Sequence, residues 1–591
     1  MTTPYFSLIH AVWKHGKAWH KSIILYYIFH MLAQIFLSMS PYTFGRTINI
    51  LQHFSSERLH EVILWISTSV FLLLMFWLFH WPARLQECRV AQNIKQNLRA
   101  QIYEQLTYMP LKWHQKHHSG NVVTRLFRAS NSLFKFSSEQ FIYIEAIVKV
   151  FVSCFFLLWL SLPLGLLNIL CCLIAIITVL LFDKKLIPLY AKENEIDNRI
   201  GAVLFDYISN ITTILALRLN KLTKDNLVHR MLSIWPFYKK NIVLNEIKWF
   251  TVGVLLAVLQ SAILIGYIIR SLDKYNMVLI GSVVMIFRYQ WDLNDVFFNF
   301  TSQYSELARM DTDVKDLDPI LNDIRLWSIP ILNNEIFFTR WDKIKIQKLI
   351  FNHNESTNRK EVFINLNFCI DRGEKIALIG SSGAGKSTLL NLIRGLYEPN
   401  SVSLLIDGQS FETLEPLKHI STLIYQDPEI FENTIAFNIT MDISSTEDEI
   451  LSAIRLAKFE NILTNLPDGL ATDIREKGLN LSVGQKQRLA LARGLFAARF
   501  SSILLMDEPT SSVDLPTERE ILANILNAFT EKTIIVSLHR LHLLPKFDRI
   551  IMLENGKIIA NGLSKVLLNM PGVVQDLWYG YLEKQPLVTN N

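Results

Sequence analysis

KIALIGSSGAGKSTLLNLI, residues 375–393, is the stretch that decides the fold of the second half of this chain. Its apolar start predicts a buried strand, its closely spaced glycines predict a tight loop, and its leucine-rich end predicts a helix. This order forms a P-loop, whose backbone N–H groups surround phosphate oxygens at the positively polarised N-terminus of a helix. The residues predicted to bind nucleotide are Gly380, Ser381, Ser382, Gly383, Ala384, Gly385, Lys386, Ser387 and Thr388.

Two carboxylates follow a second apolar run, residues 503–506, and extend this site. Lys386 is expected to reach the β- and γ-phosphates, and Ser387 and Asp507 are expected to bind Mg²⁺. Glu508 follows at once and is placed to polarise the attacking water. The acidic pair lies about 120 residues after the P-loop, and the two motifs together predict a site that hydrolyses a nucleoside triphosphate.

The first half of the chain has the pattern of a membrane domain. No charged residue occurs from Val150 to Phe182, which is longer than the about 20 residues that cross a bilayer, and residues 161–165 contain a proline and a glycine that favour a turn. We therefore expect two spans there. Four further apolar runs bring the prediction to six spans between residues 20 and 305; they are Ile23–Phe44, Val62–Phe79, Phe250–Ile269 and a run from Asn276 that becomes polar in its second half.

The distribution of charge predicts the orientation of these spans. The chain is 50% hydrophobic and 19% charged, with a net charge of +6. About twenty Lys and Arg residues lie in segments 83–137 and 183–248, so the positive-inside rule makes these segments and both termini cytoplasmic. The positive charge then reports orientation, and we expect a lipid bilayer and no nucleic acid as a partner. Five cysteines without a CxxC pair exclude a disulfide framework.

The N-terminal residues have neither the features of a secretory signal nor those of a mitochondrial presequence. Phe6, Ile9, Val12 and Trp13 recur at helical spacing near lysines, which predicts a helix on the membrane surface. We expect a multi-pass protein of the bacterial inner membrane, with its nucleotide-binding domain in the cytoplasm. The predicted segments are an interfacial helix at 1–21, a transmembrane domain with six spans and two long cytoplasmic helical extensions at 22–310, a linker at 311–341 and a nucleotide-binding domain at 342–591.

The stretch LNLSVGQKQRLALAR, residues 479–493, resembles the signature motif of ATP-binding cassette (ABC) proteins. It lies between the two nucleotide motifs, as in that family. Gln426 is similar to the Q-loop glutamine, Asp514 to the D-loop aspartate and His539 to the switch histidine. With six spans ahead of one cassette, the chain resembles an ABC exporter half-transporter of the type I exporter, or type IV transmembrane, fold. This resemblance implies an all-α six-helix transmembrane domain followed by an α/β P-loop NTPase domain.

The resemblance also implies that two chains together form each site that binds ATP and Mg²⁺. Ser482, Gly484 and Gln485 of one cassette would complete the ATP site of the other, so a second half-transporter is required. A homodimer would hold two competent sites, and a heterodimer remains an alternative. Within each site, Glu508 would be the general base, His539 would contact the γ-phosphate, Gln426 would reach both water and Mg²⁺, and Asp514 would belong to the interface.

Several segments resemble exporter elements or depart from them. Residues 109–126 are similar to the first intracellular loop of exporters, and residues 472–478 are similar to their X-loop, although Arg475 stands where glycine is usual. His353 occupies the position where exporters usually place an aromatic ring under adenine. A histidine stacks more weakly, so nucleotide affinity or base selectivity is expected to differ.

The transported substrate is predicted only as a class. Arg288 is expected near mid-membrane, about 18 Å from the outer end of its helix at 1.5 Å per residue. It either pairs with Asp292 one turn on, with Asp295 continuing the polar face, or contacts an acidic or zwitterionic headgroup. Glu145 and Lys149 are spaced for a second internal pair.

We expect an ATP-driven exporter of an amphipathic or hydrophobic substrate such as a lipid, peptide or drug. Two alternatives are an importer on the exporter fold, as in some siderophore systems, and a non-transporting ATP-gated regulator. The presence of Glu508 and His539 argues against the regulator, because a pure switch does not need hydrolysis.

Overall fold

A computed structural model gives the fold and divides the chain into two compact units. The first comprises residues 1–109 and 117–328, and the second comprises residues 110–116 and 329–591. The structure describes residues 3–117, 119–327, 340–353, 362–427, 429–474 and 481–583. Part of the predicted linker and residues 475–478 of the X-loop, including Arg475, lie outside the described residues.

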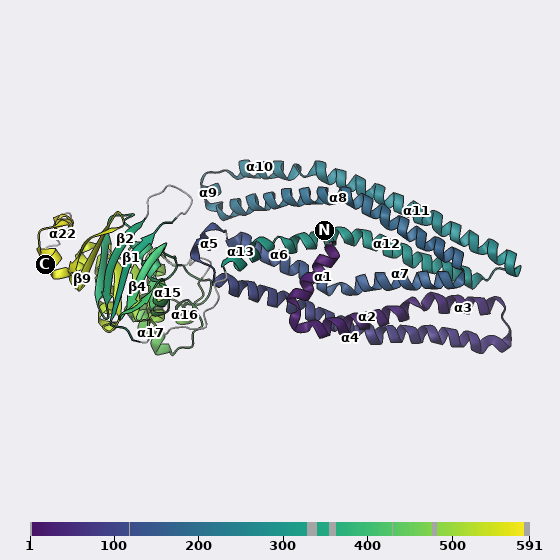
Figure 1. Cartoon of the computed structure of the whole chain (residues 1–591), viewed down its shortest axis with the longest axis horizontal. Coiled ribbons are helices and arrows are strands. Elements are labelled where there is room, and N and C mark those ends of the chain that lie inside the picture. Colours follow the sequence, from purple (N-terminus) through teal and green to yellow (C-terminus); the bar gives the residue numbers. More distant parts are fainter. Residues whose placement is uncertain are drawn as a thin grey trace. The chain divides into compact units, whose positions relative to one another are not determined.

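The first unit is built from helices, several of which are long (Figure 1). Its main helices are α1 Pro4–His15, α2 His20–Ser38, α3 Ser40–Gln52, α4 Leu59–Thr107, α6 Ser119–Ser138, α7 Gln140–Leu160, α8 Leu162–Ser209, α9 Ile211–Ala216, α10 Asn220–Leu232, α11 Trp235–Tyr275, α12 Ile280–Lys315 and α13 Asp318–Trp327. The predicted N-terminal helix is present as α1. Its Leu8 and Val12 are buried, whereas Phe6 and Trp13 are exposed.

Among the described residues, five helical segments are long and apolar enough to cross a membrane: Lys17–Gln52, Ser56–Thr107, Gln140–Leu160, Leu162–Ser209 and Asn220–Asp273. The sixth predicted span corresponds to α12, whose polar second half keeps it out of this set. The predicted break at residues 161–165 falls at Ser161, whose extended backbone separates α7 from α8. The first predicted span is not one helix, because α2 ends at Ser38 and α3 begins at Ser40, next to Pro41 in its first turn.

Two helices continue far beyond the length that a bilayer requires. The 49 residues of α4 correspond to about 74 Å at 1.5 Å per residue, against a hydrocarbon thickness of ~30 Å. Helix α8 is nearly as long, with 48 residues, and it packs along α11. These continuations provide the long helices that the sequence predicts after the second and fourth spans.

Buried polar groups join the helices of this unit. The Glu87 carboxylate of α4 is fully buried, accepts hydrogen bonds from Arg84 Nη1 at 2.7 Å and the Phe141 N–H at 3.0 Å, and lies 3.3 Å from His30 Nε2. It therefore connects α4 with α2 and with the first turn of α7. A second buried pair, Lys248 and Asp183 at 3.1 Å, connects α11 with α8.

The intramembrane pairs predicted from sequence are present. Lys149 Nζ lies 2.7 Å from Glu145 and also 3.4 Å from Asp295 on α12. Arg288 and Asp292 approach to 3.9 Å, and the Arg288 side chain is 59% exposed in the single chain. Asp295, which the sequence placed only on the polar face continuing from Arg288, thus pairs with Lys149 of another helix.

The second unit is an α/β domain with two sheets. Its helices are α5 Leu111–Lys116, α14 Lys386–Ile393, α15 Glu415–Ile420, α16 Ile435–Thr440, α17 Glu447–Leu456, α18 Glu460–Thr464, α19 Val483–Ala498, α20 Leu515–Ala528, α21 Ser564–Asn569 and α22 Val573–Glu583. Its strands are β1 Lys343–Phe351, β2 Phe363–Asp371, β3 Lys375–Gly380, β4 Ser401–Ile406, β5 Gln409–Phe411, β6 Ser421–Ile424, β7 Ile503–Asp507, β8 Thr533–Ser537, β9 Arg549–Glu554 and β10 Lys557–Leu563. Helix α5 comes from the segment that resembles an intracellular loop, and its Gln115 donates to Tyr397 Oη at 3.2 Å.

The smaller sheet is antiparallel with strand order β2-β1-β4-β5, and the larger sheet has the order β10-β9-β3-β8-β7-β6. Strand β3 alternates between two cores: Ile376 and Leu378 pack toward the smaller sheet, and Ala377 and Ile379 pack toward the helices that include α19 and α20. Both faces of β3 are therefore buried, as the continuous apolar run predicts.

The order of the larger sheet positions the functional residues. Strands β3, β8, β7 and β6 pair in parallel, with Leu378 opposite Ser537 and Ser537 opposite Asp507. Parallel strands end at the same edge of a sheet, so the segments that follow these four strands meet there. They carry the P-loop, His539, Glu508 and Gln426.

Candidate functional site

The P-loop leaves β3 at Gly380 and enters α14 at Lys386, as the sequence predicts. Gly385 has a φ of +103°, and a Cβ there would lie 2.9 Å from the Phe363 ring. A Cβ at Gly380 would lie 2.2 Å from the Leu553 carbonyl oxygen. Both positions therefore require glycine for steric reasons. Of the other loop residues, Ala384 is buried, Thr388 is half-buried, and Ser381, Ser382, Gly383 and Ser387 are exposed.

The Lys386 side chain is buried at the base of this loop. Its Nζ donates to the carbonyl oxygens of Gly380 at 3.0 Å and Ser381 at 3.2 Å. Burial lowers the pKa of Lys386, and the nearby carboxylates of Glu508 and Asp507 partly offset this effect. The ammonium group thus lies at the phosphate loop and in the field of the two acidic residues.

The two acidic residues at the end of β7 have different surroundings. Asp507 is buried, and its Oδ1 has no hydrogen-bond partner in the described structure. Glu508 has a φ of +46°, an uncommon backbone conformation for a residue other than glycine. Its side chain is 13% exposed, and burial raises its pKa, assisted by the charge of Asp507. One carboxylate is thus free to accept a cation, and the other holds a proton more readily than usual.

His539 follows β8 and lies directly against Glu508. Its Nε2 is 2.6 Å from Glu508 Oε1, and this contact opposes the rise in the Glu508 pKa. The imidazole is half exposed, so one side of it faces the space beyond the sheet edge. The sequence names both residues as catalytic candidates, and the parallel pairing of β7 and β8 brings them together.

The signature residues form the N-terminus of α19. The Ser482 hydroxyl oxygen accepts from the Gln485 N–H at 3.3 Å, and the Gln485 Oε1 accepts from the Ser482 N–H at 2.8 Å, which is a capping box. Gly484 packs against the turn at Ser512, where a Cβ would lie 2.9 Å from the carbonyl oxygen. Within the described residues, no hydrogen bond joins Ser482 or Gly484 to the P-loop of the same chain.

Asp514 has a structural role that its motif does not reveal. It is the N-cap of α20, and its carboxylate accepts from the Thr517 N–H at 3.1 Å, which lowers its pKa. The turn before it is held by Arg540, which sequence reasoning missed. Arg540 Nη1 donates to Glu518 at 2.7 Å and to the Val513 carbonyl at 2.9 Å. Its position next to His539 was the available signal.

Gln426 is exposed at the end of β6, and its contact is made by its backbone. Its carbonyl oxygen accepts from Gln487 Nε2 at 3.4 Å. Gln487 is a second residue missed from sequence, although it stands inside the quoted signature stretch. It is 2% exposed and contacts the segments that carry Gln426, Glu508 and Asp514.

His353 lies beside the P-loop helix. Its Nε2 is 3.4 Å from Thr388 Oγ1, and its ring meets the edges of Phe351 and Tyr397. Burial lowers its pKa, with a smaller effect from the charge of Lys112, so the ring is neutral at pH 7. Tyr397 itself stacks on Phe351.

The donor set fits ATP with Mg²⁺. Ser387, Gln426 and Asp507 offer a hydroxyl, a carboxamide and a carboxylate, the oxygen ligands that Mg²⁺ prefers, and the free Oδ1 of Asp507 is a suitable acceptor for a cation. The glycine loop and the buried Lys386 fit a polyphosphate. In the described residues, no group of three or more His, Cys, Asp or Glu side chains forms another metal site.

Two family models match this chain, one for each unit. The model described as ABC transporter transmembrane region matches residues 23–293, and the model described as ABC transporter matches residues 363–511. The chain belongs to the ABC transporter family. The signature stretch and Gln426 lie inside the second matched segment, whereas Asp514 and His539 follow it along the chain.

Known proteins place this ABC transporter among exporter-like relatives. It is 27% identical over 504 residues to "ATP-binding cassette sub-family B member 6" of Xenopus tropicalis, covering 83% of this chain and 57% of that protein. It is 34% identical over 236 residues to the "ATP-dependent lipid A-core flippase" of Burkholderia pseudomallei, covering 40% of this chain and 39% of that protein. The chain thus spans between two-fifths and three-fifths of these relatives.

A solved structure shares the fold of this ABC transporter. The structure of a bacterial Atm1-family ABC exporter with ATP bound superposes with a TM-score of 0.79 and 21% sequence identity, covering 96% of this chain and 99% of that one. The overall architecture is therefore that of a helical transmembrane domain followed by an α/β nucleotide-binding domain.

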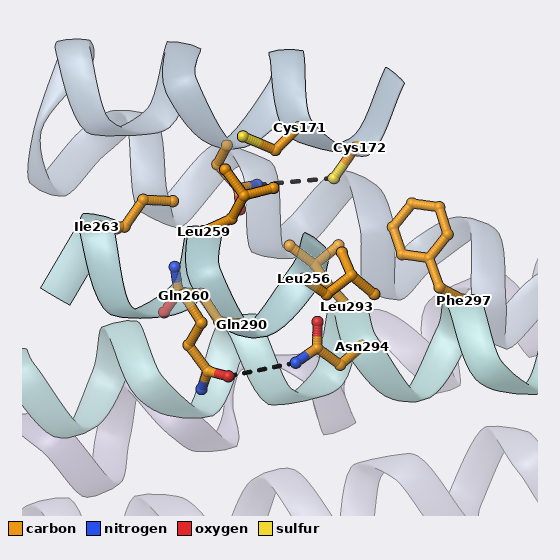
Figure 2. Close-up of a pocket in the computed structure, with 11 residues that line it drawn as sticks. Cys171, Cys172, Leu256, Leu259, Gln260, Ile263, Gln290, Leu293, Asn294 and Phe297 are labelled. Atoms are coloured by element: carbon orange, nitrogen blue, oxygen red, sulfur yellow. Dashed lines mark hydrogen bonds between the residues drawn. The ribbon is translucent and has the colours of Figure 1, made fainter. Parts of the chain in front are cut away.

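The transmembrane unit of the transporter contains a small pocket of mixed polar and apolar lining between α8, α11 and α12 (Figure 2). Its polar lining consists of carboxamides and thiols without a charged side chain: Asn168, Gln260, Gln290, Asn294, Cys171 and Cys172. Asn294 Nδ2 donates to Gln260 Oε1 at 3.3 Å, as Figure 2 shows. Gln260 Nε2 and Gln290 Oε1 have no hydrogen-bond partner in the described structure. The pocket thus offers one donor and one acceptor for an uncharged group.

Proposed function

We propose that this chain is a half-transporter of an ATP-driven exporter that hydrolyses ATP at sites formed between two cassettes. The proposal rests on the common edge of β3, β8, β7 and β6, where Lys386, Asp507, Glu508 and His539 gather, with the last two 2.6 Å apart. This arrangement supports hydrolysis as well as binding, because it pairs a phosphate loop with a base and its orienting partner.

Glu508 is the proposed general base. Its raised pKa makes the carboxylate a stronger proton acceptor than an exposed glutamate, and such bases work best when their pKa approaches the working pH. His539 fixes the Glu508 carboxylate through Nε2 and leaves the exposed part of its ring for the γ-phosphate and the attacking water. The two residues thus orient the water on one side of the phosphate.

Lys386, Ser387, Gln426 and Asp507 are proposed to hold the nucleotide. Lys386 would exchange its contacts with two loop carbonyls for the β- and γ-phosphate oxygens. Ser387, Asp507 and Gln426 would hold Mg²⁺, which neutralises charge on the phosphate oxygens. His353, neutral and beside Thr388, is proposed to contact the adenine ring.

Two copies of the chain are proposed to complete each other's sites. The Ser482 oxygen is an acceptor in the capping box, so its hydroxyl hydrogen remains available to donate to the γ-phosphate bound by a second cassette. Gly484 lies in the same first turn of α19 and supplies an N–H group there, whereas the Gln485 N–H is used by the Ser482 oxygen. One chain has the residues for both halves of a site, which supports a homodimer, and Asp514 is proposed to lie in its interface.

The proposed substrate is an amphipathic or hydrophobic molecule such as a lipid, a peptide or a drug. The pocket in Figure 2 is about 20 Å³, room for about one water molecule, so it does not itself hold such a substrate; its lining only supports the absence of a counter-charge for an ion. Arg288 lies outside that pocket and is already near Asp292. We propose export from a cytoplasmic side that also holds the cassette, at a bacterial inner membrane.

The test compares ATP hydrolysis by the purified full chain in lipid vesicles with that of Glu508→Gln. We expect a fall in kcat of roughly 10²- to 10⁴-fold, because the base is lost while ATP binding remains. Glu412→Gln, the same change at an exposed cassette position, should match the wild type. Equal rates for the wild type and Glu508→Gln would contradict the proposal, and activity of the chain alone would establish that a homodimer suffices. In vesicles whose cassettes face outward, ATP-driven uptake of the transported molecule indicates export, and its release indicates import.

A further inference from the structure

Gln487 is a buried polar residue in the signature helix that the functions assigned above do not use. It is the fifth residue of α19, on the second turn after Ser482, and only 2% of its surface is exposed. A carboxamide in such a place is unfavourable unless hydrogen bonds replace its water. Its contacts therefore indicate what the residue does.

Both ends of the Gln487 carboxamide are engaged. Its Nε2 donates to Ser511 Oγ at 3.0 Å and approaches the carbonyl oxygens of Gln426 and Glu508 at 3.4 Å each. Its Oε1 accepts from the Ser512 N–H at 2.8 Å. Each contact reaches a segment outside α19, and two of them end on the peptide groups of predicted site residues.

These segments carry the parts of the hydrolytic site. Gln426 follows β6 and Glu508 follows β7, and Ser511 and Ser512 form the turn that leads to Asp514. Gln487 itself belongs to the helix whose first turn presents Ser482. A single side chain thus connects the residues that act on the chain's own nucleotide with the helix end proposed to act on the nucleotide of a second cassette.

The backbone of Glu508 explains why such a connection is useful. Its φ of +46° is unfavourable for glutamate, and conformations of this kind persist when surrounding contacts fix them. The Glu508 N–H donates to the Ser537 carbonyl at 3.3 Å on one side, and the Glu508 carbonyl accepts from Gln487 on the other. The same carbonyl also accepts from the Ser511 N–H at 3.2 Å, so Gln487 binds both the Glu508 carbonyl and the Ser511 residue that contacts it.

We propose that Gln487 is a positioning residue for ATP hydrolysis, one that fixes the Glu508 and Gln426 backbones and the Ser511–Ser512 turn to the signature helix. Because of these contacts, Ser482 is positioned for the nucleotide of the second cassette only when Glu508 of the same chain is positioned for hydrolysis. Gln487 would act through these backbone segments and not through a contact of its own with the nucleotide. This inference rests on the proposed function, because it concerns the same hydrolytic site.

The test uses two substitutions that separate the two ends of the carboxamide. Gln487→Glu keeps an oxygen for the Ser512 N–H and removes the donor to Ser511, Gln426 and Glu508. Gln487→Met keeps the length and removes both. Gln409→Glu, the same change at an exposed position of β5, is the matched control. Each full-length variant is reconstituted in nanodiscs, and its melting temperature is recorded.

We expect both Gln487 variants to lower kcat by roughly 10- to 100-fold, the effect of a displaced catalytic group. The Kd for ATP, measured on the Glu508→Gln background, should change by less than about threefold, because no P-loop contact is altered. The Hill coefficient for ATP should also fall toward one. Unchanged kcat in both variants would overturn the proposal, and so would a joint loss of kcat, ATP affinity and melting temperature, which would indicate packing alone.

A second measurement needs no hydrolysis and so separates this inference from the proposed function. Amide hydrogen exchange of the peptide covering residues 511–514 is compared without nucleotide. We expect at least about tenfold faster exchange in Gln487→Met, which loses the acceptor for the Ser512 N–H, and near wild-type exchange in Gln487→Glu. If the wild type lacks ATPase activity, the proposed function fails. The exchange pattern still tests whether Gln487 holds the Ser511–Ser512 turn. Equal exchange in all variants would overturn it.

Discussion

The buried pair of Lys248 and Asp183 provides a sharp test of how the transmembrane unit is held together. Lys248 on α11 is fully buried and Asp183 on α8 is 5% exposed, and Lys248 Nζ donates to Asp183 Oδ1 at 3.1 Å. The other carboxylate oxygen has no hydrogen-bond partner in the described structure. We predict that Lys248→Met strongly destabilises the protein.

The magnitude follows from the unequal costs of removing one partner or both. Methionine retains most of the apolar stem of lysine, so little packing is lost, but Asp183 becomes a buried carboxylate without its cation. Breaking a buried pair in this way costs about 3–5 kcal/mol, whereas replacing both partners by apolar residues is often neutral or stabilising. The double variant Lys248→Met with Asp183→Leu should therefore recover at least about 2 kcal/mol relative to Lys248→Met.

The assay is a double-mutant cycle by denaturant titration of the full chain in mild detergent, followed by tryptophan fluorescence. Lys185→Met, a change of lysine at an exposed position of α8 close to Asp183, is the control and should cost within about 0.5 kcal/mol. A cost below about 1 kcal/mol for Lys248→Met, or single effects that simply add in the double variant, would refute the reasoning.

Two further predictions concern activity. Because burial raises the pKa of Glu508 and the base acts when deprotonated, kcat should fall as the pH is lowered and begin to fall at a higher pH than an exposed glutamate would allow. His539→Ala removes a group that lowers this pKa, so the acidic limb of the pH profile of kcat should move to higher pH; an unmoved limb would show that another group titrates. In the membrane pocket, Gln290→Leu removes a buried acceptor without a partner, so stability should stay equal or rise by about 1 kcal/mol while stimulation of ATPase activity by lipids, peptides or dyes falls; unchanged stimulation would exclude the pocket from the substrate path.

Local patterns in the sequence were sufficient for the main elements. The apolar run before Gly380 forms β3, the leucine-rich segment after it forms α14, and the predicted break at residues 161–165 lies at Ser161. These features depend on neighbours within a few positions, where backbone sterics and hydrogen bonding to nearby groups dominate. The break at Met39 was missed because the apolar run continues through it, although Pro41 marks the first turn of α3.

Other features required the partners that folding supplies. Asp295 pairs with Lys149 from another helix, a partner that the spacing within its own helix could not indicate. Gln487 and Arg540 stood inside or beside quoted motifs, but this position did not reveal their partners, because a glutamine or arginine at a helical or loop position is usually solvated. Only the turn of residues 510–514 packed against them revealed their roles.

The sequence by itself determined that one half of this protein is a chain of membrane-length apolar helices and the other a P-loop domain of ABC type, because periodicity, charge and glycine spacing are local properties. The tertiary structure decided which side chains act together. Parallel pairing of β3, β8 and β7 places His539 2.6 Å from Glu508, 31 positions earlier, and burial at that edge raises the pKa of the Glu508 carboxyl. Distances across a sheet and the loss of water around a charge arise only when distant segments pack, which is why no motif contains them.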